Sequence, residues 1–200
     1  MKSRAIADLE EIRRRARENV EHGAVTENYR ADRGTVLKLL NEALATELVC
    51  SLRYQRHYFM ATGIHSRAIA DEFQQHANDE REHANRIAER IVQLDGAPNF
   101  NPEGMVSRSH SDYVEGASLL DMIKEDLIAE RIAIDTYREI IGFVGNDDPT
   151  TRRLFEEILA KEEEHAQELA TIIASLDKDV LLYDRPLPSG QPADDPVTEP

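Results

Sequence analysis

Ionisable side chains interrupt the four longest apolar stripes of the sequence, near the middle of each stripe. Two stripes carry a glutamate followed three residues later by a histidine, and the other two carry a single glutamate. Residues three apart on a helix project from the same face, so each Glu-x-x-His pair can hold one ion together. The interrupting residues are Glu47, Glu80, His83, Glu130, Glu162 and His165.

Burying these groups has a chemical consequence. Four carboxylates that face one another in a dry core repel, and an unpaired buried carboxylate destabilises the fold strongly. Two divalent cations remove this cost, because their charge balances four carboxylates while two neutral imidazoles add nitrogen ligands. Each Glu-x-x-His pair then supplies one bridging carboxylate and one nitrogen, and Glu47 and Glu130 supply terminal carboxylates.

The donor set indicates which metal such a site would bind. Oxygen-rich ligation with one nitrogen per ion suits iron or manganese, whereas structural zinc prefers a closed shell with sulfur or several histidines. The only cysteine, Cys50, excludes both a cysteine-based zinc site and an intramolecular disulfide. We therefore expect two iron ions per chain, with manganese as the alternative.

Two tyrosines follow the single glutamates at equal distance. Tyr54 lies seven residues after Glu47, and Tyr137 lies seven residues after Glu130. At this spacing each phenol can hydrogen-bond a ligand or be oxidised during turnover, and simple packing is the alternative. Both interpretations stay open for Tyr54, which we include with the catalytic residues, whereas packing is favoured for Tyr137.

The other histidines are not predicted to be ligands. His76 lies on the same stripe as Glu80, and we expect it in the core or beside a ligand. His57, His65 and His110 are expected at the surface or in loops.

Four long helices are needed to bring the six residues together. Apolar residues recur at spacings of three and four over residues 32–62, 66–95, 118–144 and 148–176. Short connections join the first two helices and the last two, so each pair should be antiparallel. The middle connection, 96–117, contains three glycines and two prolines and is long enough to cross the bundle. We expect an all-α four-helix bundle with one long crossover.

Two further segments flank this bundle, which we place at residues 31–176. Residues 1–30 carry apolar residues at helical spacing beside four arginines within 13–17. This pattern predicts a short amphipathic helix that lies on the bundle or on a neighbouring subunit, with an arginine-mediated nucleic-acid contact as the alternative. Residues 177–200 hold five of the eight prolines and are expected to form an acidic tail that is extended or disordered.

Composition narrows the class of protein. A chain of 200 residues with a net charge of −15 offers no overall field for binding phosphate, so a nucleic-acid partner is not expected. No apolar run approaches the roughly 18 residues of a membrane span, and we expect no membrane partner. The single cysteine and the charged N-terminus favour the cytoplasm.

Several stretches of this sequence resemble the bacterioferritins of the ferritin-like superfamily. Residues 40–49 and the run DEREHA at 79–84 are similar to the first two bundle helices of that family, and 126–130 and the run EEEH at 162–165 are similar to the last two. The resemblance spans about 36–176. It implies a ferritin-like bundle in which the same six residues are di-iron ferroxidase ligands and Tyr54 is the neighbouring tyrosine.

The resemblance also implies a function. Such a protein stores or detoxifies iron by oxidising Fe(II) with O2 or H2O2, within a homo-oligomeric cage. Haem is not predicted, because Arg81 stands where bacterioferritins carry the methionine that ligates haem. Two alternatives remain: a peroxide-scavenging di-iron or di-manganese enzyme of rubrerythrin or catalase type, and a DNA-protecting miniferritin. Miniferritins, however, hold their metal between subunits rather than inside one bundle.

Overall fold

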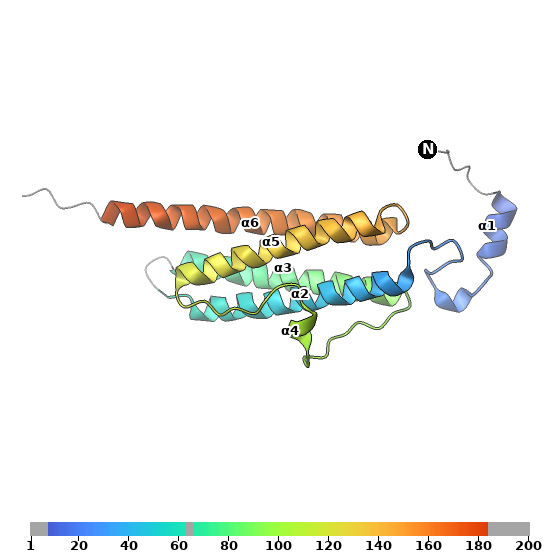
Figure 1. Ribbon diagram of the computed structural model, residues 1–200, viewed down its shortest axis with the longest axis horizontal. Helices are drawn as coiled ribbons and strands as arrows, with labels where there is room; N and C mark the ends of the chain where they lie inside the picture. Colours follow the sequence, from blue (N-terminus) through green and yellow to red (C-terminus); the bar gives the residue numbers. More distant parts are fainter. Residues whose placement is uncertain (1–7, 63–65, 184–200) are drawn as a thin grey trace, which may run out of the picture.

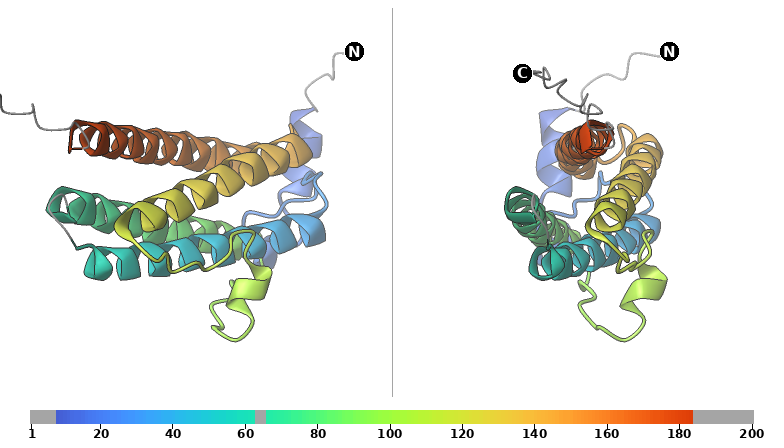
Figure 2. Two further views of the ribbon diagram at one scale, coloured as in Figure 1. Left: turned by 60° about the vertical axis from the view of Figure 1, so that its left-hand side comes forward. Right: turned by 90° about the vertical axis from the view of Figure 1, so that its left-hand side faces the viewer.

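Four long helices dominate the computed structural model, which describes residues 8–62 and 66–183, with side chains as far as 176 (Figure 1). They form two antiparallel pairs, and the end-on view in Figure 2 shows all four arranged around one core. The prediction of an all-α four-helix bundle is confirmed. The helices are α2 (Arg33–Met60), α3 (Ser66–Gln93), α5 (Leu119–Val144) and α6 (Pro149–Tyr183).

Local signals in the sequence set where these helices begin. The Asp32 carboxylate accepts a hydrogen bond from the Thr35 amide at 3.2 Å, and the Ser118 hydroxyl accepts one from the Asp121 amide at 3.2 Å. Asp148 accepts a hydrogen bond from the Thr151 amide at 2.9 Å. These contacts satisfy amides that lack a partner inside the first helical turn, so the helix starts follow the capping pattern of the sequence.

The crossover between α3 and α5 runs along the outside of α2. It contains one short helix, α4 (Met105–Arg108), which stands out from the bundle in Figure 2. A ring nitrogen of His110 lies 3.1 Å from the Thr46 hydroxyl, and the Arg53 guanidinium donates to the Asp112 carbonyl at 2.8 Å. These contacts fix the crossover to α2, and the predicted long connection is confirmed.

The apolar core is divided into two clusters along the bundle. One cluster includes Leu40, Ile87 and Phe155, and the other includes Phe73 and Leu169. The six ionisable residues predicted as ligands are buried at mid-helix, on the same helices that form both clusters. The apolar clusters therefore position the polar centre and exclude water from it.

The N-terminal extension contains a short helix, as predicted, but this helix ends before the helical spacing of apolar residues does. Helix α1 (Leu9–Arg15) is short and is followed by a 3-10 turn, η1 (Val20–His22). Asn19 adopts left-handed backbone angles with φ 49°, which interrupts the helix. Leu9 and Val20 are exposed, so the apolar stripe of this segment is not buried against its own bundle. Figure 1 shows α1 projecting beyond the end of the bundle.

The C-terminal boundary also differs. Helix α6 continues to Tyr183, so the first seven residues of the predicted 177–200 tail are helical rather than extended. No proline or glycine lies between Pro149 and Pro186, and Lys178, Leu181 and Leu182 are good helix formers. The rest of the predicted tail lies outside the described residues. None of the described helices is long and apolar enough to span a bilayer.

A buried ion pair connects the two halves of the bundle. The Arg53 guanidinium on α2 donates to an Asp126 carboxylate oxygen on α5 at 2.9 Å, and His57 lies 2.8 Å from the other oxygen. Arg53 and Asp126 are at most 1% exposed. Removing one member leaves the other charge buried without a partner, which is costly.

We therefore expect Asp126→Ala to lower the free energy of unfolding by about 3–5 kcal/mol. Urea unfolding of the metal-free protein, followed by circular dichroism, measures this loss. The control is Asp135→Ala on the same helix, whose carboxylate is exposed. A loss of less than about 1 kcal/mol, as expected for exposed pairs, would show that Asp126 does not hold the two halves together.

Candidate metal centre

The structure brings all six predicted residues to one buried place in the middle of the bundle. Each of the four helices contributes, and none of the six side chains is more than 6% exposed. The residues are Glu47 on α2, Glu80 and His83 on α3, Glu130 on α5, and Glu162 and His165 on α6.

The six side chains divide into two overlapping groups. In one, single ligand atoms of Glu47, Glu80, His83 and Glu162 all lie within 4.8 Å of one another. In the other, atoms of Glu80, Glu130, Glu162 and His165 meet the same limit. Because Glu80 and Glu162 belong to both groups, the geometry fits two adjacent ions that share two bridging carboxylates.

Several buried polar atoms at the centre lack hydrogen-bond partners within the described part of the chain. They include Nδ1 of both His83 and His165, and both Glu162 carboxylate oxygens. Nδ1 of His83 lies 3.0 Å from Glu162 Oε1, and Nδ1 of His165 lies 3.4 Å from Glu80 Oε1. Buried polar atoms without partners are costly in a native core. A cation among them satisfies all of these atoms, so the residues fit a metal.

Burial and neighbouring charge shift the protonation of this centre. Desolvation, reinforced by the charge of Glu80, raises the pKa of Glu47 to about 8. Desolvation and nearby carboxylates likewise raise the pKa of Glu162 to about 8. Burial alone would lower the pKa of His83, but the neighbouring carboxylates of Glu162 and Glu47 raise it well above the usual range. The same balance raises the pKa of His165. Without a cation, the centre therefore holds protons at neutral pH.

Both tyrosines donate hydrogen bonds to carboxylates of the centre. The Tyr54 hydroxyl on α2 donates to Glu130 on α5, and the Tyr137 hydroxyl on α5 donates to Glu47 on α2. Burial raises the pKa of both phenols well above the usual value, so they remain donors. For Tyr137 the sequence favoured packing alone, and that prediction missed this cross-bundle contact. Such hydrogen bonds orient a carboxylate ligand.

The sequence did not predict Asp79 as part of the centre. An Asp79 oxygen lies 3.2 Å from Nε2 of His165, so this ring presents Nδ1 to the centre and Nε2 to a carboxylate. A carboxylate behind a histidine fixes the ring and increases its basicity. The signal available in the sequence was only that Asp79 directly precedes Glu80.

Of the other histidines, His57 does not lie where the sequence predicted, whereas His110 does. His57 is fully buried against Asp126, so its predicted surface position is wrong. Thr46, Cys50, Arg53 and His57 recur at helical spacing, and this second, mixed stripe was the missed signal. His110 lies in the crossover as predicted, and His65 lies outside the described residues.

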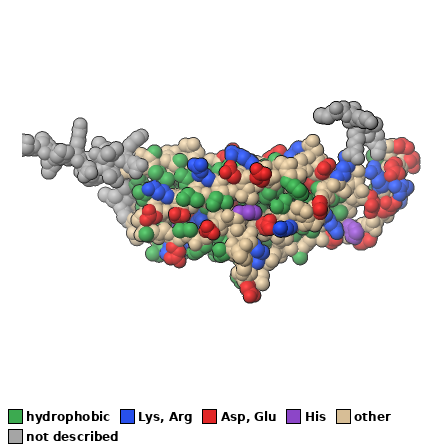
Figure 3. All heavy atoms as spheres, viewed as in Figure 1, with side chains coloured by type: hydrophobic (Ala, Val, Ile, Leu, Met, Phe, Trp, Pro, Cys, Tyr) green, Lys and Arg blue, Asp and Glu red, His purple; other side chains and the backbone are tan. Residues whose placement is uncertain are grey.

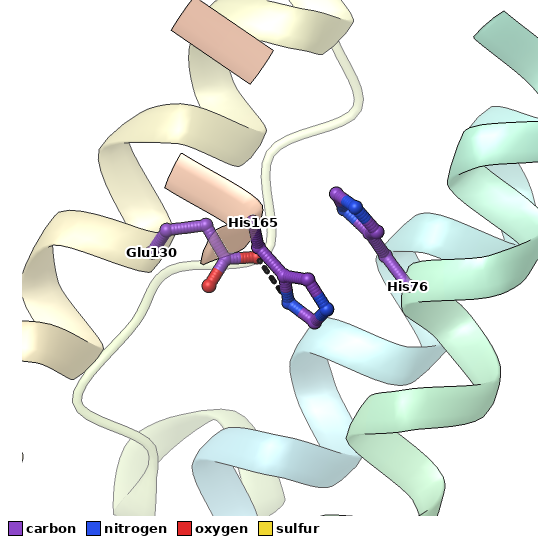
Figure 4. Close-up of side chains that lie close together, drawn as sticks. All are labelled: His76, Glu130 and His165. Atoms are coloured by element: carbon purple, nitrogen blue, oxygen red, sulfur yellow. Dashed lines mark ion pairs between the residues drawn. The ribbon is translucent and has the colours of Figure 1, made fainter. Parts of the chain in front are cut away.

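His76 is buried beside the centre, as predicted. Its ring stacks on the His165 ring, with centroids 3.9 Å apart and planes inclined by 22°. Figure 4 shows both rings beside Glu130, with His76 coming from α3 and His165 from α6. Desolvation lowers the pKa of His76, which keeps this imidazole neutral.

Comparison with known proteins agrees with this geometry. The ferritin-like domain family matches residues 37–178, which is most of the chain. The chain belongs to the ferritin-like family. Within it, the bacterioferritin of Mycobacterium avium is 35% identical over 144 residues, covering 72% of this chain and 86% of the relative. The resemblance to bacterioferritins is therefore confirmed.

Two other proteins that this chain is similar to are described by their assembly or by their partner. A solved structure, described as a dodecameric thioferritin and the bacterioferritin-related protein from Bacteroides fragilis, superposes with a TM-score of 0.75 at 29% identity. The alignment covers 78% of this chain and 94% of that one. A nutrient stress-induced DNA-binding protein from Synechococcus is 30% identical over 138 residues, covering 68% of this chain and 78% of that protein.

Proposed function

We propose that this bacterioferritin-like protein is a ferroxidase that stores or detoxifies iron. The observation that carries the proposal is the pair of overlapping ligand groups that share Glu80 and Glu162 inside one bundle. Two Fe(II) ions bind there as substrate, one with His83 and one with His165. Glu47 and Glu130 are the terminal carboxylates, held by Tyr137 and Tyr54.

Two Fe(II) ions at this site can together supply two electrons to one oxidant molecule. Each of the two Fe(II) ions gives one electron, and O2 takes up both electrons and two protons to become H2O2. If H2O2 is the oxidant, it accepts two electrons and two protons to give two waters. The redox chemistry belongs to the metals, while the protein fixes their ligands, their separation and their access to water.

Stopped-flow oxidation with simultaneous oxygen measurement tests this function. We expect a rapid phase of Fe(III) formation that saturates at two Fe(II) per chain, with one O2 consumed for every two ions. The absence of a saturable rapid phase would contradict the proposal. Continuous turnover of peroxide by a manganese-loaded protein, without retained iron, would instead indicate the peroxide-scavenging alternative.

Proton release gives a second test, independent of oxidation. At pH 7 the metal-free centre holds protons on Glu47, Glu162, His83 and His165, so anaerobic binding of two Co2+ ions should release about four protons per chain. As the pH rises through about 8, the two glutamates ionise in the metal-free centre, so the release should fall toward about two. A pH-stat measures this, and a release independent of pH between 6 and 9 would contradict the assigned protonation.

We also propose that the protein assembles into a homo-oligomeric cage. Large apolar side chains remain exposed on the outer faces of α2 and α5, including Phe59, Leu52, Ile128 and Phe143. Figure 3 shows hydrophobic side chains interspersed with charges of both signs along one face of the bundle. These exposed apolar side chains are available to pack against a neighbouring subunit. The dodecameric relative offers a precedent for the assembly.

The similarity to a protein named as DNA-binding favours one second candidate, in which α1 contacts phosphate. Within α1, however, Arg13 is paired with Glu10 at 2.8 Å and Arg14 with Glu11 at 2.9 Å. A salt-dependent gel shift that disappears on deletion of residues 1–30 would support this candidate. We expect no such shift, because these arginines lie beside carboxylates and the chain carries a net charge of −15.

A further inference from the structure

A second group of metal-binding side chains lies outside the six-residue centre. Glu72 and His76 on α3 face Glu168 on α6, and one ligand atom from each lies within 4.8 Å of the others. Nε2 of His76 lies 3.0 Å from a Glu168 oxygen and 3.8 Å from a Glu72 oxygen. The two carboxylates are partly exposed, whereas the His76 side chain is 1% exposed.

This group lies at a groove between α3 and α6. The groove has a volume of about 350 Å³, and both Glu72 and Glu168 line it. The rest of its lining is mainly apolar or uncharged, including Ile69, Thr171 and Ile172. Two carboxylates are therefore the only charged groups among the described lining residues, and they give the groove the chemistry of a cation site rather than of an anion site.

His76 connects the groove to the buried centre. Its ring stacks on His165, and a ring nitrogen lies within 4.8 Å of ligand atoms of both Glu130 and His165. Nδ1 of His76 is buried and has no hydrogen-bond partner within the described part of the chain. His76 therefore belongs both to the group that contains the groove carboxylates and to a group that contains Glu130 and His165 of the centre. Figure 4 shows His76 facing His165 and Glu130.

We propose that Glu72, His76 and Glu168 form a third divalent-cation site, through which ions pass between the groove and the buried centre. The inference rests on the proposed function, because it assigns the route by which that centre receives its substrate. Two carboxylates and one imidazole suit Fe(II), Mn(II) or Co(II), and the exposed edge of the site leaves room for water ligands. The open ligand set gives weaker binding than the enclosed centre, as a transfer step needs.

Anaerobic titration with Co2+, followed by absorption and by metal analysis after gel filtration, tests this site directly. The wild-type chain should bind three ions, two tightly and one more weakly. The double variant Glu72→Gln with Glu168→Gln should lose only the weak ion. Glu89→Gln with Glu164→Gln is the matched control, since it removes two exposed carboxylates from the same helices and should retain all three ions.

The rate of Fe(II) oxidation distinguishes transfer of ions through the third site from simple binding of an ion there. At low Fe(II) concentration the groove variant should oxidise iron at least about tenfold more slowly than the control variant, while still oxidising two ions per chain at completion. Equal Co2+ stoichiometry and equal rates in the groove and control variants would overturn the third site. In that case the proposed ferroxidase would stand, because its own test is the saturation of the wild-type chain at two ions.

Discussion

Replacing Glu80 and Glu162 together by alanine is expected to slow the initial oxidation of Fe(II) at least about a hundredfold, since removing only a group that supports a ligand already costs about 10–100-fold. These two carboxylates are shared by both ligand groups, so their loss opens both metal positions at once. Stopped-flow absorbance of Fe(III) measures the rate.

The fold should survive this change, because it removes buried charges rather than apolar packing. Far-ultraviolet circular dichroism of the double variant should match that of the wild type. The control variant Glu82→Ala with Glu163→Ala changes exposed residues on the same two helices and should oxidise iron at the wild-type rate. An unchanged rate in the Glu80 and Glu162 variant would show that the ions bind elsewhere.

The second large effect that we expect is a rise in the melting temperature when metal binds. Binding a ligand to the folded state alone, at a thousand times its dissociation constant, stabilises a protein by about 4 kcal/mol. Each kcal/mol raises the melting temperature of a domain of this size by about 2–4 °C. Two Co2+ ions should therefore raise the melting temperature of the metal-free protein by about 15 °C or more, as measured by calorimetry without oxygen.

The expected rise in melting temperature comes from one buried site, so a variant of that site is its control. The buried atoms of Glu162, His83 and His165 that lack partners gain them when the ions bind. In the Glu80→Ala with Glu162→Ala variant, Co2+ should move the melting temperature by no more than about 3 °C. A shift of equal size in both proteins would mean that the stabilising ions bind at the surface.

The sequence predicted the helices and the six central residues because both depend on regular spacing. A buried stripe with period 3.6 determines which face of a helix lies inward, so a glutamate on that stripe, such as Glu47, must enter the core. The pairing of Tyr137 with Glu47 could not be obtained in this way. It depends on the register between α2 and α5, which is set by tertiary packing of the two helix pairs.

Contacts that cross between elements were missed for the same reason. In the sequence, Asp126 and Arg53 are two separate charged residues on two predicted helices. Only the packed bundle shows that they form a buried ion pair. In the N-terminal segment the predicted helix is present but shorter than its apolar spacing suggested. Its apolar spacing is helical, but Leu9 and Val20 find no surface of their own bundle to cover, so spacing alone overestimated the helix.

The most direct test of iron storage is the amount of iron that the protein retains. Metal-free protein is loaded in air with a large excess of Fe(II), desalted, analysed for iron and sized by light scattering. We expect the protein to retain tens of iron atoms or more per chain, on a particle of many chains. About two per chain on a small oligomer would contradict storage while keeping the di-iron centre, and none would contradict both.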